Sequence, residues 1–378
     1  MRVPLSIAGV PMPEARVPVE GLLRPEVLAL SAYHVPDSTG YIKLDAMENP
    51  YAWPEVTVDA WLEVLRGAEP NRYPDPACKP LKAALKTANG VPAGADVLLG
   101  NGSDEIIQML LMALKPGSAV LAPEPTFVMY RQISRSLGLP FVGVPLVTDD
   151  FELDMAALAA AIESHRPAII FLAYPNNPTG NLFNADAMKR IIEMAPGLVV
   201  VDEAYAPYAD ASFMGELESY GNLLVMRTLS KLGLAGLRLG FLAGSPSWIA
   251  ELDKVRLPYN INVLTQKSAE FALANPEVFE SQVAHILADR GHLLDALRRC
   301  PELRVHESHA NFILLRLLRH DATAVFNALK SQGVLIKNLH PAGGALSHCL
   351  RVTVGKPAEN RRFLDAFLAA LDDGNLRV

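Results

Sequence analysis

The sequence predicts an α/β fold with a mostly parallel sheet, followed by a smaller α+β domain. Short apolar runs alternate with helical patterns along the middle of the chain, which is typical of a parallel sheet covered on both faces. The runs that we expect to form buried strands lie at 119–122, 168–172, 198–201, 223–226 and 239–244. Because 378 residues are too many for one compact core, two domains are expected.

A different pattern follows Asn262. A long helical stretch leads to expected strands near 311–316, 334–337 and 349–354, with helices at about 321–331 and 357–372. We interpret this part as the small α+β domain. The expected division is an N-terminal arm at 1–45, packed on the small domain or on a partner subunit, a large domain at 46–265 and a small domain at 266–378.

Proline is concentrated at the start of the chain. Twelve of the 29 prolines lie in the first 80 residues, and proline disfavours the interiors of helices and strands. We therefore expect an extended arm with short elements there, and regular structure from about Asn101 onward. The stretch 103–117 then has a helical apolar face, acidic residues in its first turn and a Pro116-Gly117 stop.

Composition narrows the possible classes of function. Half of the chain is apolar and a fifth is charged, as in ordinary soluble proteins, and the net charge of -7 argues against a general nucleic-acid surface. No apolar run reaches membrane length, and Pro4 and Pro11 interrupt the short apolar start, so we expect a cytoplasmic protein. The cysteines, Cys78, Cys300 and Cys349, show no paired spacing, which fits a reducing compartment.

Metal binding is not expected. His306 and His309 have the spacing H-x-x-H, but no third ligand is apparent in the sequence. Surface or strand histidines are the better interpretation of this pair.

Three polar motifs each follow one of the expected strands. YPNNPTG follows AIIFL, DEAY follows LVVV, and RTLSK follows LLVM. Ligands bind outside the carboxyl ends of strands in open parallel sheets, so we expect the motifs to meet in one crevice. Their residue types suit a pyridine aldehyde cofactor. Lys231 can form a Schiff base with the aldehyde, and Asp202 can keep the ring nitrogen protonated, which makes the ring a better electron sink.

Other side chains have the chemistry to hold the rest of such a cofactor. Tyr205 and Asn177 can hydrogen-bond the ring oxygen, and Phe127 can stack on the ring face. A phosphate group needs backbone N–H groups at a helix N-terminus together with a cation. The candidates for this role are Gly102, Ser103 and Asp104, which open a helix, and Arg238, seven residues after Lys231.

At this point the sequence resembles the fold-type I pyridoxal-5'-phosphate (PLP) aminotransferases, and within them the histidinol-phosphate aminotransferases. The resemblance covers nearly the whole chain and is carried, in family order, by LDAMENPY at 44–51, RYPDP at 72–76, GNGSDEII at 100–107, APEPTFVMY at 122–130, YPNNPTG at 174–180, VDEAY at 201–205, RTLSKLGLAGLRLG at 227–240 and CLRVTVG at 349–355. It implies an aspartate-aminotransferase-like fold, PLP as the cofactor and a homodimer with active sites at the interface.

The resemblance also implies roles for individual residues. Lys231 resembles the Schiff-base lysine, Asp202 the partner of the pyridine nitrogen, and Tyr205 with Asn177 the ligands of the ring oxygen. The other implied cofactor ligands are Phe127 in the stacking position, and Ser103, Asp104, Thr228, Ser230 and Arg238 in the phosphate cup. Tyr73 resembles the tyrosine that reaches the phosphate of the neighbouring subunit's cofactor.

Substrate contacts are implied at three positions. Arg351 resembles the arginine that binds the substrate's anionic end, and Tyr33 resembles a substrate-contact tyrosine. Lys337 stands where some histidinol-phosphate enzymes carry an arginine, so it keeps the charge but loses the bidentate fork. The chain also departs from the family at Met47, which replaces a common asparagine, and in the segment 231–238, which is one residue shorter than in many relatives.

The expected reaction converts L-histidinol phosphate and 2-oxoglutarate to imidazole-acetol phosphate and L-glutamate, a step of histidine biosynthesis. Lys231 would act as the general base and acid. Two rival activities on the same fold are aromatic amino-acid transamination and threonine-phosphate decarboxylation. A non-enzymatic alternative is a PLP-binding regulatory module, but such regulators carry a helix-turn-helix domain, and none is seen in the first 100 residues.

Overall fold

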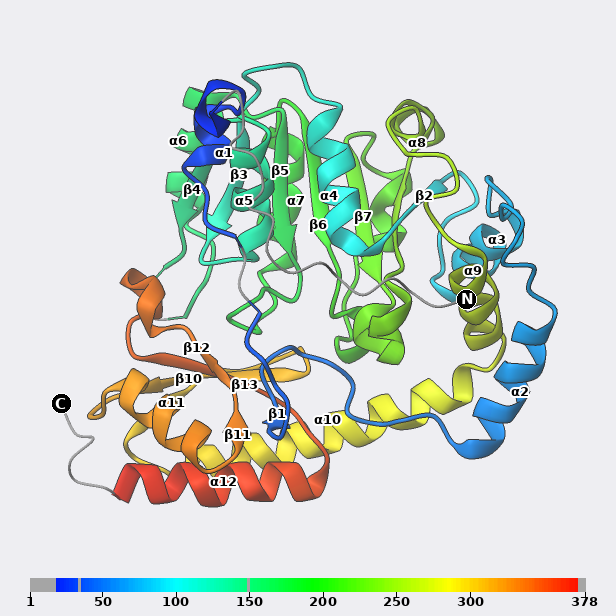
Figure 1. Ribbon diagram of the computed structural model, residues 1–378. Helices are drawn as coiled ribbons and strands as arrows, with labels where there is room; N and C mark the ends of the chain where they lie inside the picture. The colour runs from blue at the N-terminus through cyan, green and yellow to red at the C-terminus, as the bar shows by residue number, and fades with distance from the viewer. Residues whose placement is uncertain (1–17, 33–34, 148–149, 373–378) are drawn as a thin grey trace.

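A seven-stranded sheet dominates the computed structural model, which describes residues 18–32, 35–147 and 150–372 (Figure 1). Its strand order is β2-β8-β7-β6-β5-β3-β4. The strand β8 pairs antiparallel with both β2 and β7, and the other neighbouring strands pair in parallel. The strands are β2 (Asp96–Gly100), β3 (Val120–Glu124), β4 (Phe141–Pro145), β5 (Ile169–Ala173), β6 (Leu198–Asp202), β7 (Leu223–Thr228) and β8 (Gly240–Gly244). The prediction of a mostly parallel sheet is therefore confirmed.

Helices pack on both faces of this sheet, because its central strands are apolar on both sides. One core cluster lies between the sheet and α4 (Gly102–Met112), α5 (Val128–Ser136) and α8 (Pro246–Asp253). A second cluster lies on the other face and includes residues of α3 (Lys79–Ala88), α6 (Met155–His165), α7 (Ala185–Met194) and α9 (Val263–Ala274). The carboxyl ends of the parallel strands thus emerge from a rigid, doubly covered layer.

The second part of the molecule is built on a four-stranded antiparallel sheet with the order β12-β13-β10-β9. Its strands are β9 (Leu303–Val305), β10 (Phe312–Leu317), β12 (Lys337–Asn338) and β13 (Cys349–Thr353). The helices beside it are α11 (Ala322–Ser331) and α12 (Pro357–Asp372). A short parallel pair joins β1 (Ile42–Lys43) to β11 (Val334–Leu335), so the early chain reaches this part of the molecule.

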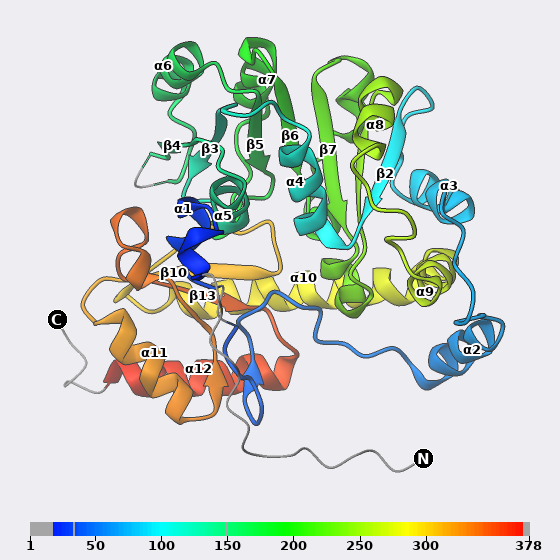
Figure 2. The same cartoon turned by 45° about the horizontal axis from the view of Figure 1, so that its top comes forward.

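The long helix α10 (Pro276–Arg298) connects the two parts (Figure 2). It packs against β9 and β10 and also against the short helices that follow β6 and β7. The remaining short helices are α1 (Pro25–Leu28) and the turns Val19–Gly21, Ala206–Tyr208, Met214–Glu218, Ser230–Leu234, Ala235–Leu237, His340–Ala342 and Gly344–Leu346. The division of the chain at residues 45 and 265 stays a prediction. Among the described residues, no helix is both long and apolar enough to cross a membrane.

The strands expected in the middle of the chain are confirmed, with ends that differ by at most two residues. The expectation that regular structure begins near Asn101 is wrong, because α2 (Glu55–Arg66), α3 and β2 precede it. Pro54 is the N-cap of α2, and Pro80 lies in the first turn of α3. Proline is tolerated at the start of a helix, where its missing N–H has no intrahelical partner to lose. The prolines here mark helix starts.

Candidate active site

The three polar motifs meet at the carboxyl ends of β5, β6 and β7, as their positions in the sequence predict. Their side chains form the wall of a pocket of about 110 Å³, and Asn177, Asp202 and Lys231 each come from a different motif. A larger cavity of about 430 Å³ lies nearby, and Thr228 is the one sequence-predicted residue in its described wall. The smaller pocket is therefore the candidate site.

Asp202 ends the buried strand β6 and is 4% exposed. Its Oδ2 accepts a hydrogen bond of 2.6 Å from the Tyr130 hydroxyl, and its Oδ1 accepts one of 3.1 Å from the Ala204 N–H. Burial raises the pKa of Asp202 to about 6, although both hydrogen bonds act in the opposite direction. The site thus contains a buried carboxylate that an N–H donor on a ligand would stabilise in its charged form.

Lys231 lies in the helical turn Ser230–Leu234 that follows β7. Its Nζ donates to the carbonyl oxygen of Ala46 at 3.1 Å and lies 5.8 Å from the centre of the Tyr205 ring. Burial, followed by the positive charge of Arg351, lowers the pKa of Lys231 to about 8. A substantial fraction of this amine is therefore neutral near physiological pH, which is the nucleophilic form.

Tyr205 and Asn177 come together across the pocket. Asn177 Nδ2 donates to the Tyr205 hydroxyl oxygen at 3.1 Å. Asn177 Oδ1 accepts from the Arg351 guanidinium, whose Nη2 also donates to the Asp45 carbonyl oxygen at 3.0 Å. Asn177 therefore joins two groups, the phenol that faces the pocket and the arginine behind it.

Lys337 is placed beside Arg351 by strand register. The two residues are directly paired between the antiparallel strands β12 and β13, and Lys337 is partly buried. Burial and the Arg351 charge both lower the pKa of Lys337. Two cationic side chains thus lie together in the four-stranded sheet, where they favour an anion, and Arg351 reaches the pocket wall through Asn177.

The N-terminus of α4 forms a cup together with polar groups from the turns after β7. Gly102 opens the helix with a φ of +79°, and a Cβ at this position would lie 2.6 Å from Nη2 of Arg238. Only glycine lets the guanidinium approach the helix end this closely. Arg238 also reaches Ser230 Oγ at 3.4 Å and Asp104 Oδ2 at 3.5 Å. First-turn N–H groups, hydroxyls and a guanidinium together fit a phosphate group.

These features fit PLP as a whole. The cup suits its phosphate, Asp202 suits its ring nitrogen, and Lys231 is an amine of lowered pKa in the same pocket. Ser103, Thr228 and Phe127 also line the pocket, as does Met47, the residue at which the chain departs from the family. Phe127 lies edge-on to Tyr130, with ring centres 5.6 Å apart. Together, these side chains suit a ligand that is anionic, aromatic and an aldehyde.

Not every residue named from the sequence lies in this pocket. Tyr73 is 80% exposed and stacks on Tyr259, with ring centres 4.4 Å apart and planes tilted by 19°. Arg351 and Lys337 are outside the pocket wall, although Arg351 touches it through Asn177. Tyr33 lies outside the described residues.

Two features of the site were not anticipated from the sequence. In the sequence, Tyr130 stands out only as the last residue of APEPTFVMY, yet its hydroxyl donates a hydrogen bond to Asp202. Tyr208 donates to the Lys231 carbonyl oxygen at 2.6 Å, which anchors the backbone of the lysine turn. The sequence signal for Tyr130 is its closeness to Phe127, a predicted cofactor contact, because Phe127 is the N-cap of α5 and Tyr130 lies in the first turn of that helix.

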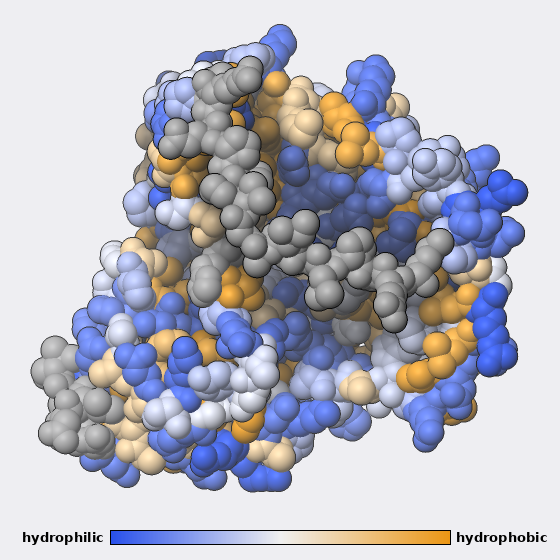
Figure 3. Space-filling view, in the orientation of Figure 1, coloured by the Kyte–Doolittle hydropathy of each residue, from blue (hydrophilic) through white to orange (hydrophobic). Residues whose placement is uncertain are grey.

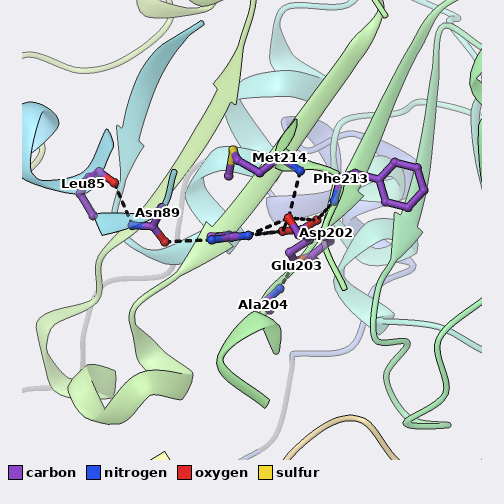
Figure 4. A network of polar contacts seen from close by, with 9 residues as sticks. Leu85, Asn89, Asp202, Glu203, Ala204, Phe213 and Met214 are labelled. Carbon is purple, nitrogen blue, oxygen red and sulfur yellow. Dashed lines mark hydrogen bonds and ion pairs between the residues drawn. The ribbon is translucent and has the colours of Figure 1, made fainter. Parts of the chain in front are cut away.

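A buried polar network lies behind Asp202 (Figure 4). Glu203 is fully buried and pairs with Arg227 at 2.7 Å, and Arg227 Nη1 donates to Asn89 Oδ1 at 3.1 Å. Glu203 also accepts hydrogen bonds from the Ser212 hydroxyl and the Phe213 N–H. Because Glu203 follows β6, Arg227 belongs to β7 and Asn89 caps α3, this network ties together the strand that carries Asp202, its neighbour β7 and the end of α3.

Known proteins are similar to this chain in sequence and in fold. The family described as aminotransferase class I and II matches residues 39–367. Histidinol-phosphate aminotransferase 2 of Nitrosococcus oceani is 56% identical over 348 residues, which is 92% of this chain and 96% of that protein. Histidinol-phosphate aminotransferase 1 of Ralstonia nicotianae is 54% identical over 358 residues, or 93% and 95% of the two chains.

A solved structure supports the fold independently. The histidinol-phosphate aminotransferase from Sinorhizobium meliloti, in complex with pyridoxal-5'-phosphate, aligns with a TM-score of 0.82 at 23% identity. The alignment covers 93% of this chain and 97% of that chain. At this identity the likeness establishes the architecture alone.

Proposed function

The chain belongs to the class I and II aminotransferase family, and from that premise we propose that it transfers the amino group of L-histidinol phosphate to 2-oxoglutarate. The products are imidazole-acetol phosphate and L-glutamate, and the reaction is a step of histidine biosynthesis. The observation that supports this substrate is the identity to two histidinol-phosphate aminotransferases, 56% and 54% over nearly the whole chain. The chain is a PLP enzyme, and the cationic pair Arg351 and Lys337 suits a phosphate-bearing amine.

The pocket residues have distinct roles in this reaction. PLP, when bound, supplies an electron-withdrawing ring that stabilises negative charge at the substrate Cα. Asp202 pairs with the ring nitrogen, Tyr205 and Asn177 hold the ring oxygen, and the cup at the α4 N-terminus holds the phosphate. Lys231 Nζ, with a pKa of about 8, takes the proton from the substrate Cα and later gives it back as an acid.

The remaining assignments concern the cofactor face and the substrate. We place Phe127 against the ring, with Gly102, Ser103, Asp104, Thr228, Ser230 and Arg238 around the phosphate. Arg351 binds the anionic end of either substrate, and Lys337 adds charge for the phosphate ester. Tyr33 remains a proposed substrate contact. We also propose a cytoplasmic location for the protein.

Replacing Lys337 with alanine should weaken the use of histidinol phosphate selectively. A phosphate dianion has three oxygens, and one arginine satisfies only two of them through parallel hydrogen bonds. Losing a charged hydrogen bond worth about 1.5–3 kcal/mol predicts a fall of roughly 10- to 150-fold in kcat/KM for histidinol phosphate. The half-reaction with 2-oxoglutarate should change much less, because Arg351 matches a carboxylate alone. Arg351→Ala should damage both half-reactions.

The substrate is tested by measuring kcat/KM for histidinol phosphate, histidinol and phenylalanine with the wild-type protein and both variants. Histidinol lacks the phosphate, so its use by wild type should be poor and insensitive to Lys337→Ala. If wild type prefers phenylalanine, or uses histidinol as well as its phosphate ester, the histidine-pathway assignment fails. An aromatic aminotransferase is then the better interpretation.

We further propose that the protein is a homodimer with shared active sites. The helix α2 buries none of its residues and exposes Val56, Leu62 and Val64, and α9, which packs beside it, exposes Leu264. Apolar side chains lie on the surface over this region (Figure 3). Clustered exposed apolar residues of this kind are typical of an interface. Tyr73 follows α2 in the sequence and is exposed, so an interface there would leave its phenol free to contact the partner subunit.

A mixture of two inactive variants tests the shared site. Chains with Lys231→Ala and chains with Tyr73→Ala, combined after subunit exchange, should form mixed dimers in which one site carries both defects and the other neither. Activity in the mixture should therefore exceed that of either parent. Absence of recovery, with exchange demonstrated by a tag on one chain, contradicts a role for Tyr73 across the interface.

A further inference from the structure

Tyr130 has no assigned role, yet it is completely buried beside the reacting groups. Its hydroxyl donates to Asp202 Oδ2 at 2.6 Å. Its ring stacks on Phe171 of β5, with centres 4.6 Å apart and planes 8° from parallel, and meets the edge of Phe127. The stack and the edge contact prevent the phenol from turning away from the carboxylate.

Asp202 needs such a donor because its surroundings favour the neutral acid. Desolvation disfavours its charge, and the nearby carboxylates of Asp104 and Glu203 act in the same direction. The Tyr205 phenol also faces this position, and Lys231 lines the same pocket. The groups that oppose these effects are two hydrogen-bond donors, the Tyr130 hydroxyl and the Ala204 N–H.

We propose that Tyr130 is a positioning residue whose hydroxyl holds the Asp202 carboxylate ionised and fixed in orientation before PLP binds. The inference rests on the role proposed for Asp202, and it extends that role to capture of the cofactor. A protonated Asp202 cannot pair with a ring N–H as an anion. The affinity of the apoprotein for PLP therefore depends on the fraction of molecules in which Asp202 is ionised.

Tyr130 suits this task because its own proton is held firmly. Burial and the adjacent Asp202 charge raise the pKa of the Tyr130 hydroxyl well above its usual range. The phenol therefore remains a donor throughout the pH range in which Asp202 titrates. A donor that does not itself ionise changes the acidity of its partner without adding a charge to the pocket.

The variant Tyr130→Phe tests the proposal through binding of PLP to the apoprotein. Removing a hydrogen bond to the charged form raises the pKa of Asp202 above its present value of about 6. As the pH is lowered, the affinity for PLP should then begin to fall at a higher pH than in wild type. The midpoint of this loss of affinity should lie about one pH unit above the wild-type midpoint. At pH 5, below both midpoints, the affinity should be roughly 10-fold lower than in wild type, whereas at pH 7 it should be roughly twofold lower. PLP is titrated into apoprotein from pH 5 to 9 and its absorbance followed.

Two controls separate the hydrogen bond from packing. Ser134→Ala removes a buried hydroxyl that donates to the Tyr130 carbonyl oxygen at 2.6 Å, so it perturbs the same helix and leaves the phenol intact. Its midpoint should match wild type. In an Asp202→Asn background, Tyr130→Phe should add no further pH shift. Ionisations of PLP itself are common to all variants and cancel in these comparisons.

Each outcome decides the question. A wild-type midpoint in folded Tyr130→Phe protein overturns the proposal, and so does a midpoint shift that persists in the Asp202→Asn background. If Asp202→Asn itself binds PLP with the wild-type pH profile, the role of Asp202 fails and Tyr130 loses its function with it. Should Tyr130→Phe not fold, 3-fluorotyrosine placed at position 130 keeps the ring stack and donates more strongly. The midpoint must then move to lower pH.

Discussion

Replacing Lys231 with alanine is expected to abolish transamination while leaving the protein folded. The substitution removes the amine that attaches to PLP and the group that moves the Cα proton. General acid–base catalysis by one side chain is worth about 10²–10⁴ in rate, and loss of the nucleophile adds to this, so a fall of at least about 10⁴-fold in kcat is expected. PLP should still bind, because the cup, Asp202 and Tyr205 are unchanged.

The environment of Lys231 explains why another lysine cannot replace it. The turn that carries it is fixed by the hydrogen bond from Tyr208 to the Lys231 carbonyl oxygen, and burial lowers the pKa of its amine to about 8. By contrast, Lys254 is exposed and pairs with Glu251 at 2.6 Å on the surface. Lys254 does not line the pocket, so its amine has no access to a cofactor held there.

Borohydride treatment of the holoenzyme, followed by peptide mapping, provides the measurement. Cofactor should be fixed to the peptide that contains Lys231, and visible absorbance of the bound cofactor should be altered in Lys231→Ala. Lys254→Ala is the matched control and should keep both label and activity. Label on any lysine other than Lys231 contradicts the assignment.

The positions of Lys231 and Asp202 could be predicted from the sequence because they depend on a general property of parallel sheets. Each follows an apolar run that had to be a buried strand, and the carboxyl ends of such strands share one edge. The apolar pattern identifies the strands, and the residues after them are brought together wherever the sheet forms.

The bond between Tyr130 and Asp202 could not be predicted in this way. It depends on how α5 lies over the sheet and on the rotation that stacks Tyr130 on Phe171. The early helices were not predicted for a different reason: proline disfavours the interior of a helix but is tolerated in the first turn, which is where Pro80 of α3 lies. Short sequence patterns predict which segments form helices or strands. The contacts between a helix and the sheet depend on tertiary packing, which such patterns do not specify.

The placement of Arg351 shows the same limit. Its resemblance to a substrate-binding arginine identified it, but the hydrogen bond to Asn177 joins segments 174 residues apart in sequence. That bond becomes visible only when the four-stranded sheet is positioned against the large one. The contact proposed for Tyr73 is harder still to predict from the sequence, since its partner belongs to another copy of the chain.

Replacing Asp202 with asparagine is expected to leave the fold intact and to reduce turnover by about 100-fold or more, comparable to removing one preorganised group that stabilises charge in a transition state. The side-chain oxygen of asparagine can accept the hydrogen bond that the Tyr130 hydroxyl donates to Asp202. Asparagine also occupies nearly the same volume as aspartate at the buried end of β6. It carries no charge, however, and cannot keep a ring nitrogen protonated. The loss should therefore appear in kcat, where charge develops at the substrate Cα.

The step affected can be isolated with substrate deuterated at Cα. If Asp202 acts on proton removal, the deuterium isotope effect on kcat should be larger in Asp202→Asn than in wild type, because that step becomes rate-limiting. Glu203→Gln is a useful comparison, because it removes a neighbouring buried charge and breaks the pair with Arg227. That variant should lose thermal stability, since it leaves the partly buried Arg227 guanidinium without its carboxylate partner. Near-normal turnover in Asp202→Asn, or an unchanged isotope effect beside a lower kcat, would show that Asp202 does not support proton removal.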